Sequence, residues 1–235
     1  MKLLAFDTST DTLHLGASDG QRNLTHAEPG GAQSSARIVP LAQATLHELG
    51  LGWADLDAIV MGRGPGSFTG LRTACAVAQG LAYGARRPVI PIDTLWAMAE
   101  DARQDQTEAR VLAVLDARMG QFYVAAWHYQ AGRWTLVEDN ALKNPPEVHW
   151  PGTWLEQGSV LTAAGLGLDP LWPRLQGGSG PPRQKMTATP NAKALLRLAP
   201  HAWAEGLAVP AEGALPLYVR DKVALTMAER AAPQP

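Results

Sequence analysis

The sequence predicts an α/β fold that is built from two related halves. An apolar run that ends on an aspartate occurs twice, before Asp7 and before Asp116, about 109 residues apart, and each copy continues as turn, strand, tight turn and strand. Helical and strand patterns then alternate after the first copy. This arrangement is typical of a duplicated α/β architecture, and it divides the chain into an N-terminal lobe, residues 1–105, and a C-terminal lobe, residues 106–235.

The first half shows clear periodic patterns. Leu13, Leu15 and Ala17 alternate with polar or small residues, as in a half-exposed strand, and Asp19-Gly20 is a hairpin turn signal. Further along, apolar residues follow helical spacing and short apolar runs alternate with them. The expected elements are strands at 2–6, 13–18 and 22–27, a helix at about 34–49, a strand at 58–62, a helix at 71–83, a strand at 88–92 and a helix from residue 94.

The second half begins with the same pattern and then becomes irregular. Strands are expected at 111–115, 122–128, 134–137 and 160–164, and a helix at 192–205 that Pro200 kinks or divides. Residues 176–183, QGGSGPPR, have the composition of a linker and predict a mobile loop.

Composition excludes several classes of protein. The net charge is −2 and the pI about 6.3, so no global basic field indicates nucleic-acid binding. Cys75 is the only cysteine, which excludes a disulfide or a cysteine metal cluster. No run approaches the roughly 18 apolar residues that span a membrane, and the N-terminal apolar run meets Asp7 too early for a signal peptide. We expect a cytoplasmic protein.

A glycine-rich loop follows the strand at 58–62. It contains Gly62, Gly64, Pro65, Gly66 and Gly70, and glycine is favoured where backbone takes positive φ or where another group approaches closely. The loop lacks the Gly-Lys-Ser/Thr of a P-loop, and it does not match the dinucleotide fingerprint. Its amides could still form an anion nest beside a helix N-terminus, although this signal alone is weak.

The helix behind this loop has apolar residues on every side, and Arg72 is its only charged residue. A helix of this kind is buried on every side. One side can face its own sheet, and the other needs a second cover, which is either more of this chain or another protein. An ordinary core helix is an equally good interpretation of the composition.

The duplicated unit with an aspartate at its first turn suggests the ATP-binding fold of actin, Hsp70 and the sugar kinases. In those proteins a glycine in this turn lets backbone amides reach the phosphates. Here Asp7 precedes Thr8 and Ser9, and Asp116 precedes Ala117, so neither turn has the glycine. We expect degraded nucleotide turns with weak or absent ATP hydrolysis. Turn formation and capping of strand ends is the simpler role of both aspartates.

Motifs for other chemistry are missing. The six histidines include no pair at the spacing of a helical metal site, and no Gly-x-Ser-x-Gly nucleophile motif occurs. We therefore expect no metal, no cofactor and no catalytic constellation.

Four motifs resemble the bacterial TsaB family, also called YeaZ: LAFDTST, GRGPGSFTGLR (Gly62 to Arg72), DARMGQFY (Asp116 to Tyr123) and PLYVRDKVA (Pro216 to Ala224). They occur in family order over nearly the whole chain. The resemblance implies the duplicated actin-like fold and a role in making threonylcarbamoyladenosine in tRNAs that read codons starting with A. In that family TsaB is a dimerisation subunit without transfer activity, TsaD is the transferase, and TsaE is an ATPase that joins the pair. Contact with tRNA would then be indirect, and any nucleotide would bind weakly at the partner junction.

The resemblance also implies an interface, because the two helices on either side of the strand at 58–62 pack in that family against equivalent helices of TsaD. Carried over, the interface with TsaD or with a second copy includes Leu41, Thr45, Leu46, Leu71, Ala74, Cys75, Ala78 and Ala82. An isolated chain is expected to form a homodimer through this face. Gln33 stands where the family often has histidine, and residues 176–183 look like a local insertion.

Two further hypotheses remain from other classes. An ATP-dependent small-molecule kinase of the same fold needs Asp7 or Asp116 to hold magnesium and nucleotide. A metallopeptidase-like protein needs a metal site, for which the sequence shows no ligand pattern.

Overall fold

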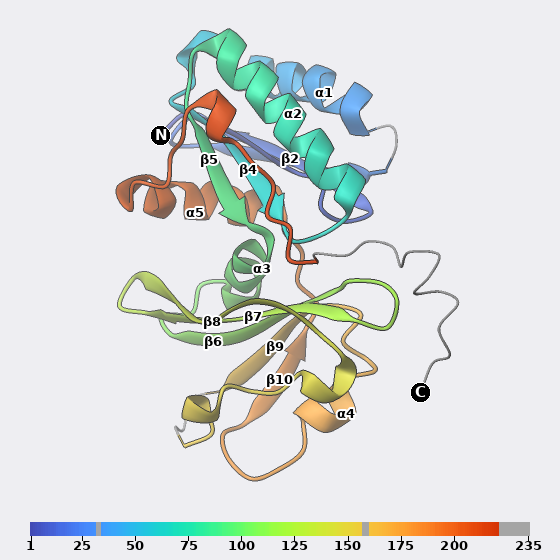
Figure 1. Cartoon of the computed structure of the whole chain (residues 1–235). Coiled ribbons are helices and arrows are strands. Elements are labelled where there is room, and N and C mark those ends of the chain that lie inside the picture. Colours follow the sequence, from blue (N-terminus) through green and yellow to red (C-terminus); the bar gives the residue numbers. More distant parts are fainter. Residues whose placement is uncertain (32–33, 157–159, 221–235) are drawn as a thin grey trace, which may run out of the picture.

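The computed structural model describes residues 1–31, 34–156 and 160–220, which form two five-stranded sheets stacked one above the other (Figure 1). The first sheet has the order β3-β2-β1-β4-β5, and the second has the order β10-β9-β6-β7-β8. In each sheet the first strand pairs antiparallel with the second and parallel with the fourth. The two halves therefore share one topology, and the predicted duplicated α/β fold is confirmed.

The elements of the first half follow the sequence patterns closely. They are β1 (Leu3–Asp7), β2 (Thr12–Ser18), β3 (Asn23–Pro29), α1 (Ser34–Glu48), β4 (Ala58–Gly64), α2 (Phe68–Ala85), β5 (Val89–Asp93) and α3 (Thr94–Arg103), with a 3₁₀ turn at Trp53–Asp55. Helix α2 begins three residues earlier than predicted because the hydroxyl of Ser67 caps it by accepting from the amide of Gly70.

The second half departs further from the predictions. Its elements are β6 (Ala109–Asp116), β7 (Phe122–Gln130), β8 (Arg133–Lys143), β9 (Leu161–Leu166), α4 (Trp172–Leu175), β10 (Arg183–Met186) and α5 (Ala192–Ala204), with 3₁₀ turns at Pro145–Glu147, Gly152–Trp154 and Ala211–Gly213. Strand β8 is longer than predicted, and β10 was not predicted. Helix α5 is one continuous helix that contains Pro200, so of the two predicted effects, a kink or a division, the division does not occur. Residues 176–182 form a loop that ends where β10 begins.

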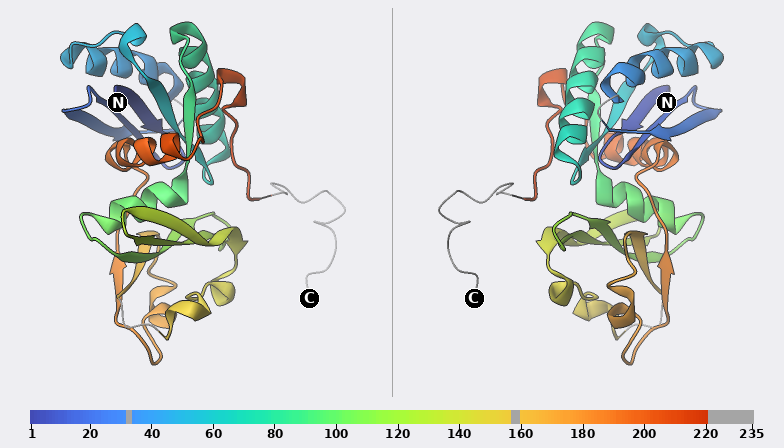
Figure 2. Two further views of the ribbon diagram at one scale, coloured as in Figure 1. Left: turned by 90° about the vertical axis from the view of Figure 1, so that its left-hand side faces the viewer. Right: turned by 90° about the vertical axis from the view of Figure 1, so that its right-hand side faces the viewer.

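Four layers result from the alternation of apolar side chains along the strands (Figures 1 and 2). Helices α1 and α2 cover the outer face of the first sheet, where Phe6 and Met61 belong to their shared core. Helices α3 and α5 lie between the two sheets. A third cluster, built around Trp150 and Trp154, covers the far face of the second sheet.

The two middle helices connect the halves. Although α3 follows the first sheet in sequence, it packs mainly on β6, β7 and β9, whereas α5 packs on the strands of the first sheet. The first sheet lies within residues 1–105 and the second begins at Ala109, but α5 and the chain after it return from the predicted C-terminal lobe to the first sheet.

Buried charges join these helices. The carboxylate of Glu100 on α3 accepts from Arg103 at 2.7 and 3.0 Å, from the indole of Trp134 at 2.8 Å, and from Arg197 of α5 at 2.8 Å. Glu100 is buried, so this network ties α3, α5 and β8 together in a low-dielectric environment.

Within the described residues, no helix has the length and apolarity needed to cross a membrane.

Candidate functional site

The glycine loop lies directly on the first turn of the chain, between β1 and β2. The amide of Ser67 donates to the carbonyl oxygen of Ser9 at 2.7 Å, and the hydroxyl of Thr8 donates to the carbonyl oxygen of Gly70 at 2.7 Å. A Cβ at Gly66 would lie 2.5 Å from the Ser9 carbonyl oxygen, and a Cβ at Gly70 would lie 1.8 Å from that of Thr8. Glycine is therefore required by the close approach of two backbones.

Asp7 is buried beneath this joint. Its carboxylate accepts from the amide and hydroxyl of Ser9 at 2.7 and 2.6 Å and from Thr94 at 3.4 Å. Burial raises its pKa to about 6, and the hydrogen bonds from Ser9 and Thr94 oppose this rise. Oδ2 lies so close to the backbone of Gly62 that a Cβ there would be 1.7 Å away. Of the three residues in the predicted first nucleotide turn, only Ser9 lines the neighbouring cleft; Asp7 and Thr8 do not.

The remaining residues of the glycine loop hold the C-terminal part of the described chain. Gly64 has φ of 108°, and a Cβ there would lie 2.9 Å from the carbonyl oxygen of Leu217. The cis bond between Gly64 and Pro65 follows. The amide of Leu217 donates to the carbonyl of Arg63 at 2.7 Å, so residues 214–220 run as a strap beside the loop.

The second aspartate turn has a different environment. Asp116 is exposed, and its Oδ1 accepts from the amide of Arg118 at 2.7 Å. Arg220, at the end of the strap, donates to the carbonyl of Ala117 and to Oε1 of Gln121, both at 3.0 Å. The strap thus connects the glycine loop of the first half to the turn of the second half.

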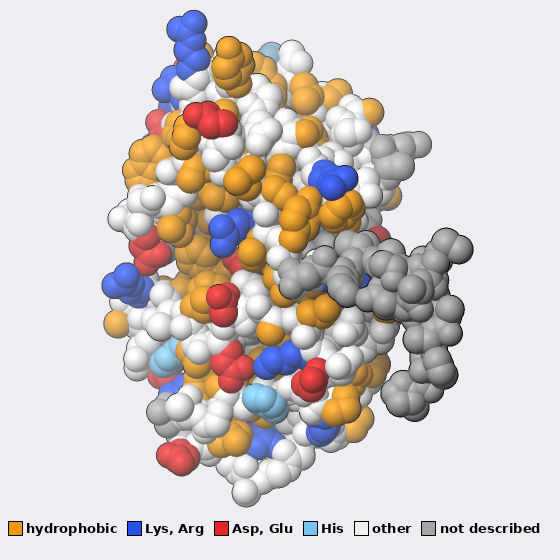
Figure 3. Space-filling view, viewed as in Figure 1, with side chains coloured by type: hydrophobic (Ala, Val, Ile, Leu, Met, Phe, Trp, Pro, Cys, Tyr) orange, Lys and Arg blue, Asp and Glu red, His pale blue; other side chains and the backbone are white. Residues whose placement is uncertain are grey.

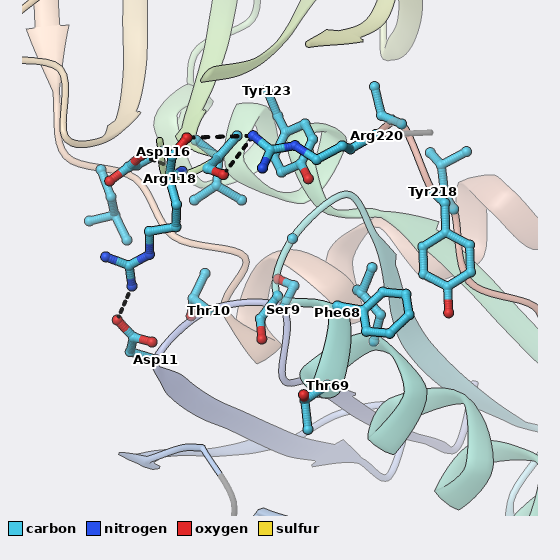
Figure 4. Close-up of a pocket in the computed structure, with 18 of the residues that line it drawn as sticks. Ser9, Thr10, Asp11, Phe68, Thr69, Asp116, Arg118, Tyr123, Tyr218 and Arg220 are labelled. Atoms are coloured by element: carbon cyan, nitrogen blue, oxygen red, sulfur yellow. Dashed lines mark hydrogen bonds and ion pairs between the residues drawn. The ribbon is translucent and has the colours of Figure 1, made fainter. Parts of the chain in front are cut away.

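A cleft of about 520 Å³ lies between these segments (Figure 4). It is lined by hydroxyl groups, aromatic rings and charges of both signs, among them Ser9, Thr10, Asp11, Ser67, Phe68, Asp116, Arg118, Tyr123, Tyr218 and Arg220. Asp11 and Arg118 form an ion pair of 2.9 Å across its edge, and both side chains are largely exposed. Its volume suits a small ligand. The expectation of a weakly bound nucleotide at a partner junction stays a prediction.

No cluster of three or more histidine, cysteine, aspartate or glutamate residues among those described is arranged to hold a metal ion.

The residues predicted to form a partner interface lie mostly in the core of the chain itself. Seven are buried and Leu41 is half-buried: Leu41, Thr45, Leu46, Leu71, Ala74, Cys75, Ala78 and Ala82. Most of them belong to the core beneath α1 and α2, where those helices pack on the first sheet, whereas Leu71 lines the cleft. Burial also raises the pKa of the Cys75 thiol to about 11. These side chains therefore do not form the outer face of the helices, which is a correction to the predicted helix orientation.

The outer face of α1 and α2 is formed by other residues. It exposes small side chains together with a few larger apolar ones, including Val39 at 40% and Tyr83 at 83%. Its exposed small residues are Ser35, Ala36, Ala44, Thr69, Ala76, Gly80 and Gly84. Glu48 is the only acidic residue of the two helices. This face is a two-helix surface on which a partner backbone can approach closely.

Two further groups were missed in the sequence. Phe68 and Tyr218 pack together with ring centroids 5.3 Å apart, and the guanidinium of Arg72 lies 3.8 Å from the centroid of Phe68. Arg118 and Met119 stand on an exposed turn of the second half, and Figure 4 shows Arg118 across the cleft from Phe68 and Tyr218. The motifs that contain these residues were recognised, but nothing in their spacing indicated that Phe68, Arg118 and Tyr218 line one cleft.

Comparisons with known proteins match a TsaD family model and several TsaB or YeaZ proteins. The family model described as "TsaD: tRNA N6-adenosine threonylcarbamoyltransferase" matches residues 20–156. The chain is 37% identical over 232 residues to the tRNA threonylcarbamoyladenosine biosynthesis protein TsaB of Escherichia coli, covering 95% of this chain and 96% of that protein. It is 42% identical over 123 residues to TsaB of Haemophilus influenzae, covering 52% of each. The solved structure of YeaZ from Pseudomonas aeruginosa matches with a TM-score of 0.81 and 36% identity, covering 92% of this chain and 99% of that one.

Proposed function

The chain belongs to the TsaB (YeaZ) family, and we propose that it is the non-catalytic partner subunit of a TsaD transferase. Membership of this family assigns it to the biosynthesis of threonylcarbamoyladenosine in tRNA. In the proposed complex it binds TsaD, works together with TsaE, and meets tRNA through the complex, in the cytoplasm.

The observation that carries the proposal is the outer face of α1 and α2. On α2 the exposed small residues Ala76 and Gly80 accompany exposed Tyr83, and α1 exposes Val39. Helices pack by fitting the side-chain ridges of one into the grooves of the other, and small residues let their axes come close. Two helices of a partner would complete a four-helix bundle on this face, and they would cover its exposed apolar side chains as protein interfaces do.

The geometry of the first turn supports a non-catalytic role. In an ATP-binding relative of this fold, backbone amides of this turn would meet phosphate. Here the turn is occupied by the glycine loop, through the contacts of Ser9 with Ser67 and of Thr8 with Gly70. Asp7 accepts from its own neighbours beneath that joint. These contacts favour a docking subunit over a kinase that holds magnesium and nucleotide with Asp7.

Two alanines two positions apart give a matched test. Ala76 is exposed on the outer face of α2, whereas Ala78 has no exposed surface. We expect Ala76→Glu to fold normally and to lose binding to TsaD, measured by biolayer interferometry. We expect Ala78→Glu to lower Tm strongly, because it places a charge in the core.

Reconstitution tests the function itself. TsaD, TsaE, tRNA and the threonylcarbamoyl-adenylate substrate are mixed with and without the chain, and modified nucleoside is measured by mass spectrometry. The wild-type chain should restore product, and Ala76→Glu should not. Full activity from TsaD and TsaE alone would refute the proposal.

The same face is expected to pair two copies of the isolated chain. Ala76→Glu should then convert a dimer into a monomer by light scattering.

A further inference from the structure

Helix α1 contains a proline on its exposed side. Pro40 lies in the interior of the helix, which runs from Ser34 to Glu48, and its side chain is exposed. Proline has no backbone N–H, so the helical hydrogen bond from residue 40 to the carbonyl oxygen of Ala36 cannot form. A proline inside a helix is destabilising for this reason. Because its ring lies outside the core, packing within the chain does not offset this loss.

The acceptor that Pro40 releases lies on the outer face of α1. Ala36 is exposed like Pro40, and residues four apart lie on the same side of a helix. The pyrrolidine ring also crowds the carbonyl of the residue four positions before it and displaces that carbonyl from the regular helical arrangement. The carbonyl oxygen of Ala36 is therefore a backbone acceptor without a helical partner, on the side of α1 that faces away from the sheet.

A partner helix can approach this oxygen closely. Exposed residues with small or compact side chains recur at intervals of four along both helices: Ala36, Pro40 and Ala44 on α1, and Ala76, Gly80 and Gly84 on α2. Such rows form the ridges against which a neighbouring helix packs, and small side chains let its axis come near. Figure 3 shows mainly hydrophobic and uncharged surface along α2. A partner that covers this face removes water from the oxygen, so it must supply a hydrogen-bond donor there.

The space between the helices selects the kind of donor. Lysine and arginine donate hydrogen bonds, but their long side chains do not fit between helix axes that small residues bring close together. Carboxylates do not donate at neutral pH. A serine or threonine hydroxyl is short and donates one hydrogen bond, so it fits the geometry around Ala36 and Pro40.

We propose that Pro40 is a recognition residue, which frees the carbonyl oxygen of Ala36 to accept a hydrogen bond from a serine or threonine hydroxyl of the partner helix that packs on α1. The inference rests on the proposed function, in which that partner is TsaD. A regular apolar helix with the same side chains has no free acceptor at this point, so the interrupted helix adds specificity to a face that is otherwise nearly uncharged.

Replacement of the proline by alanine restores the missing donor within α1. In Pro40→Ala the carbonyl of Ala36 accepts from residue 40, and the hydroxyl of the partner is then buried without its acceptor. We expect the affinity for TsaD, measured by biolayer interferometry, to fall about tenfold or more. We expect Tm to stay the same or to rise, because alanine favours a helix more than proline does.

Pro200→Ala is the matched control. Pro200 is likewise an exposed proline inside a helix, but α5 lies between the two sheets and not on the outer face. This variant should also keep or raise Tm, and its affinity for TsaD should stay within about twofold of wild type.

A second variant separates the ring of Pro40 from the carbonyl that it releases. Valine keeps a compact apolar side chain and has a backbone N–H, so Pro40→Val should weaken binding as Pro40→Ala does. If Pro40→Val binds like wild type while Pro40→Ala does not, the partner recognises the ring and the inference is wrong.

A double-mutant cycle identifies the donor. One serine or threonine in the docking helices of TsaD, changed to alanine, should weaken binding of the wild-type chain but not of Pro40→Ala. If no such residue exists, the donor is not a hydroxyl and the proposal fails.

The remaining outcomes also contradict the inference. Unchanged affinity of Pro40→Ala shows that the partner does not use this oxygen, and a lower Tm assigns the proline to the fold of the chain. An equal loss of affinity in Pro200→Ala shows an effect that is not specific to α1. Failure of the wild-type chain to bind TsaD contradicts the proposed function itself and is seen before any variant is compared.

Discussion

Replacing Asp7 by asparagine changes the pH dependence of stability in a direction that follows from burial. The pKa of Asp7 is about 6 in the folded chain, against a usual value of 3.8, because burial disfavours the charged form more than Ser9 and Thr94 favour it. The folded state therefore binds the proton more tightly than the unfolded state. The resulting stabilisation is present below pH 3.8 and is lost as the pH rises to about 6.

The size of the effect follows from the shift. A rise of about two units corresponds to about 3 kcal/mol, at 1.36 kcal/mol per unit. Asparagine does not titrate, and its amide oxygen can still accept from Ser9. The unfolding free energy of Asp7→Asn, relative to wild type, should therefore increase by about 3 kcal/mol between about pH 3.5 and pH 7.

Urea unfolding followed by tryptophan fluorescence measures this difference, because the chain has eight tryptophans. Asp19→Asn is the control. Hydrogen bonds from the amides of Arg22 and Gln21 lower the pKa of Asp19 to about 2, so its stabilisation is lost as the pH falls from 3.8 toward 2, and Asp19→Asn should show no increase relative to wild type as the pH rises from about 3.5 to 7. A difference for Asp7→Asn that stays flat, or that decreases with pH, would refute the reasoning that burial determines the charge state of Asp7.

Three other predictions concern the joint, the middle layer and the thiol. Gly70→Ala should lower the unfolding free energy by about 2 kcal/mol or more, because its Cβ meets the carbonyl oxygen of Thr8 at 1.8 Å. Gly80→Ala has open space around it and should raise the unfolding free energy by about 0.5–1 kcal/mol. Equal effects of the two variants in urea unfolding would contradict this. Glu100→Ala should cost about 3–5 kcal/mol by the same measurement, since it leaves two arginines without their buried carboxylate, and a loss below 1 kcal/mol would show that water replaces it. Cys75, whose pKa is about 11, should react with a thiol reagent at pH 8 only after urea unfolds the chain, and rapid labelling of the native chain would show that α2 opens.

The sequence was sufficient for the first half of the fold because each element there has its own periodic pattern. It failed at β10, since Arg183 to Met186 have no apolar alternation and are held by backbone pairing with β9. The tie between Arg220 and Ala117 also has no local signal, because these residues lie 103 positions apart.

The orientation of α2 could not be read from composition. Alanine occurs on both sides of this helix, so Ala76 and Ala78 look alike in the sequence although one is exposed and the other is buried. A strong contrast between apolar and polar residues normally fixes which side faces the core. Here that contrast is missing, and only the packing of α2 on β4 decides it.

The weak contrast is itself consistent with docking. A surface helix that stays in water gains from charged residues, but α2 has only Arg72 along its length.

The same contacts that seat the glycine loop on Thr8 and Ser9 also fix the start of α2, because Ser67 both donates to Ser9 and caps the helix. The filled turn after β1 and the fixed start of α2 are therefore consequences of one packing arrangement. It follows that placing a glycine at Ser9 alone would not create a phosphate site, because the amide of Ser67 would still donate to the backbone carbonyl of residue 9 and the loop would still occupy the turn. Calorimetry of Ser9→Gly with ATP should show no gain in affinity over wild type, and tight binding would show that the turn, not the loop, limits nucleotide access.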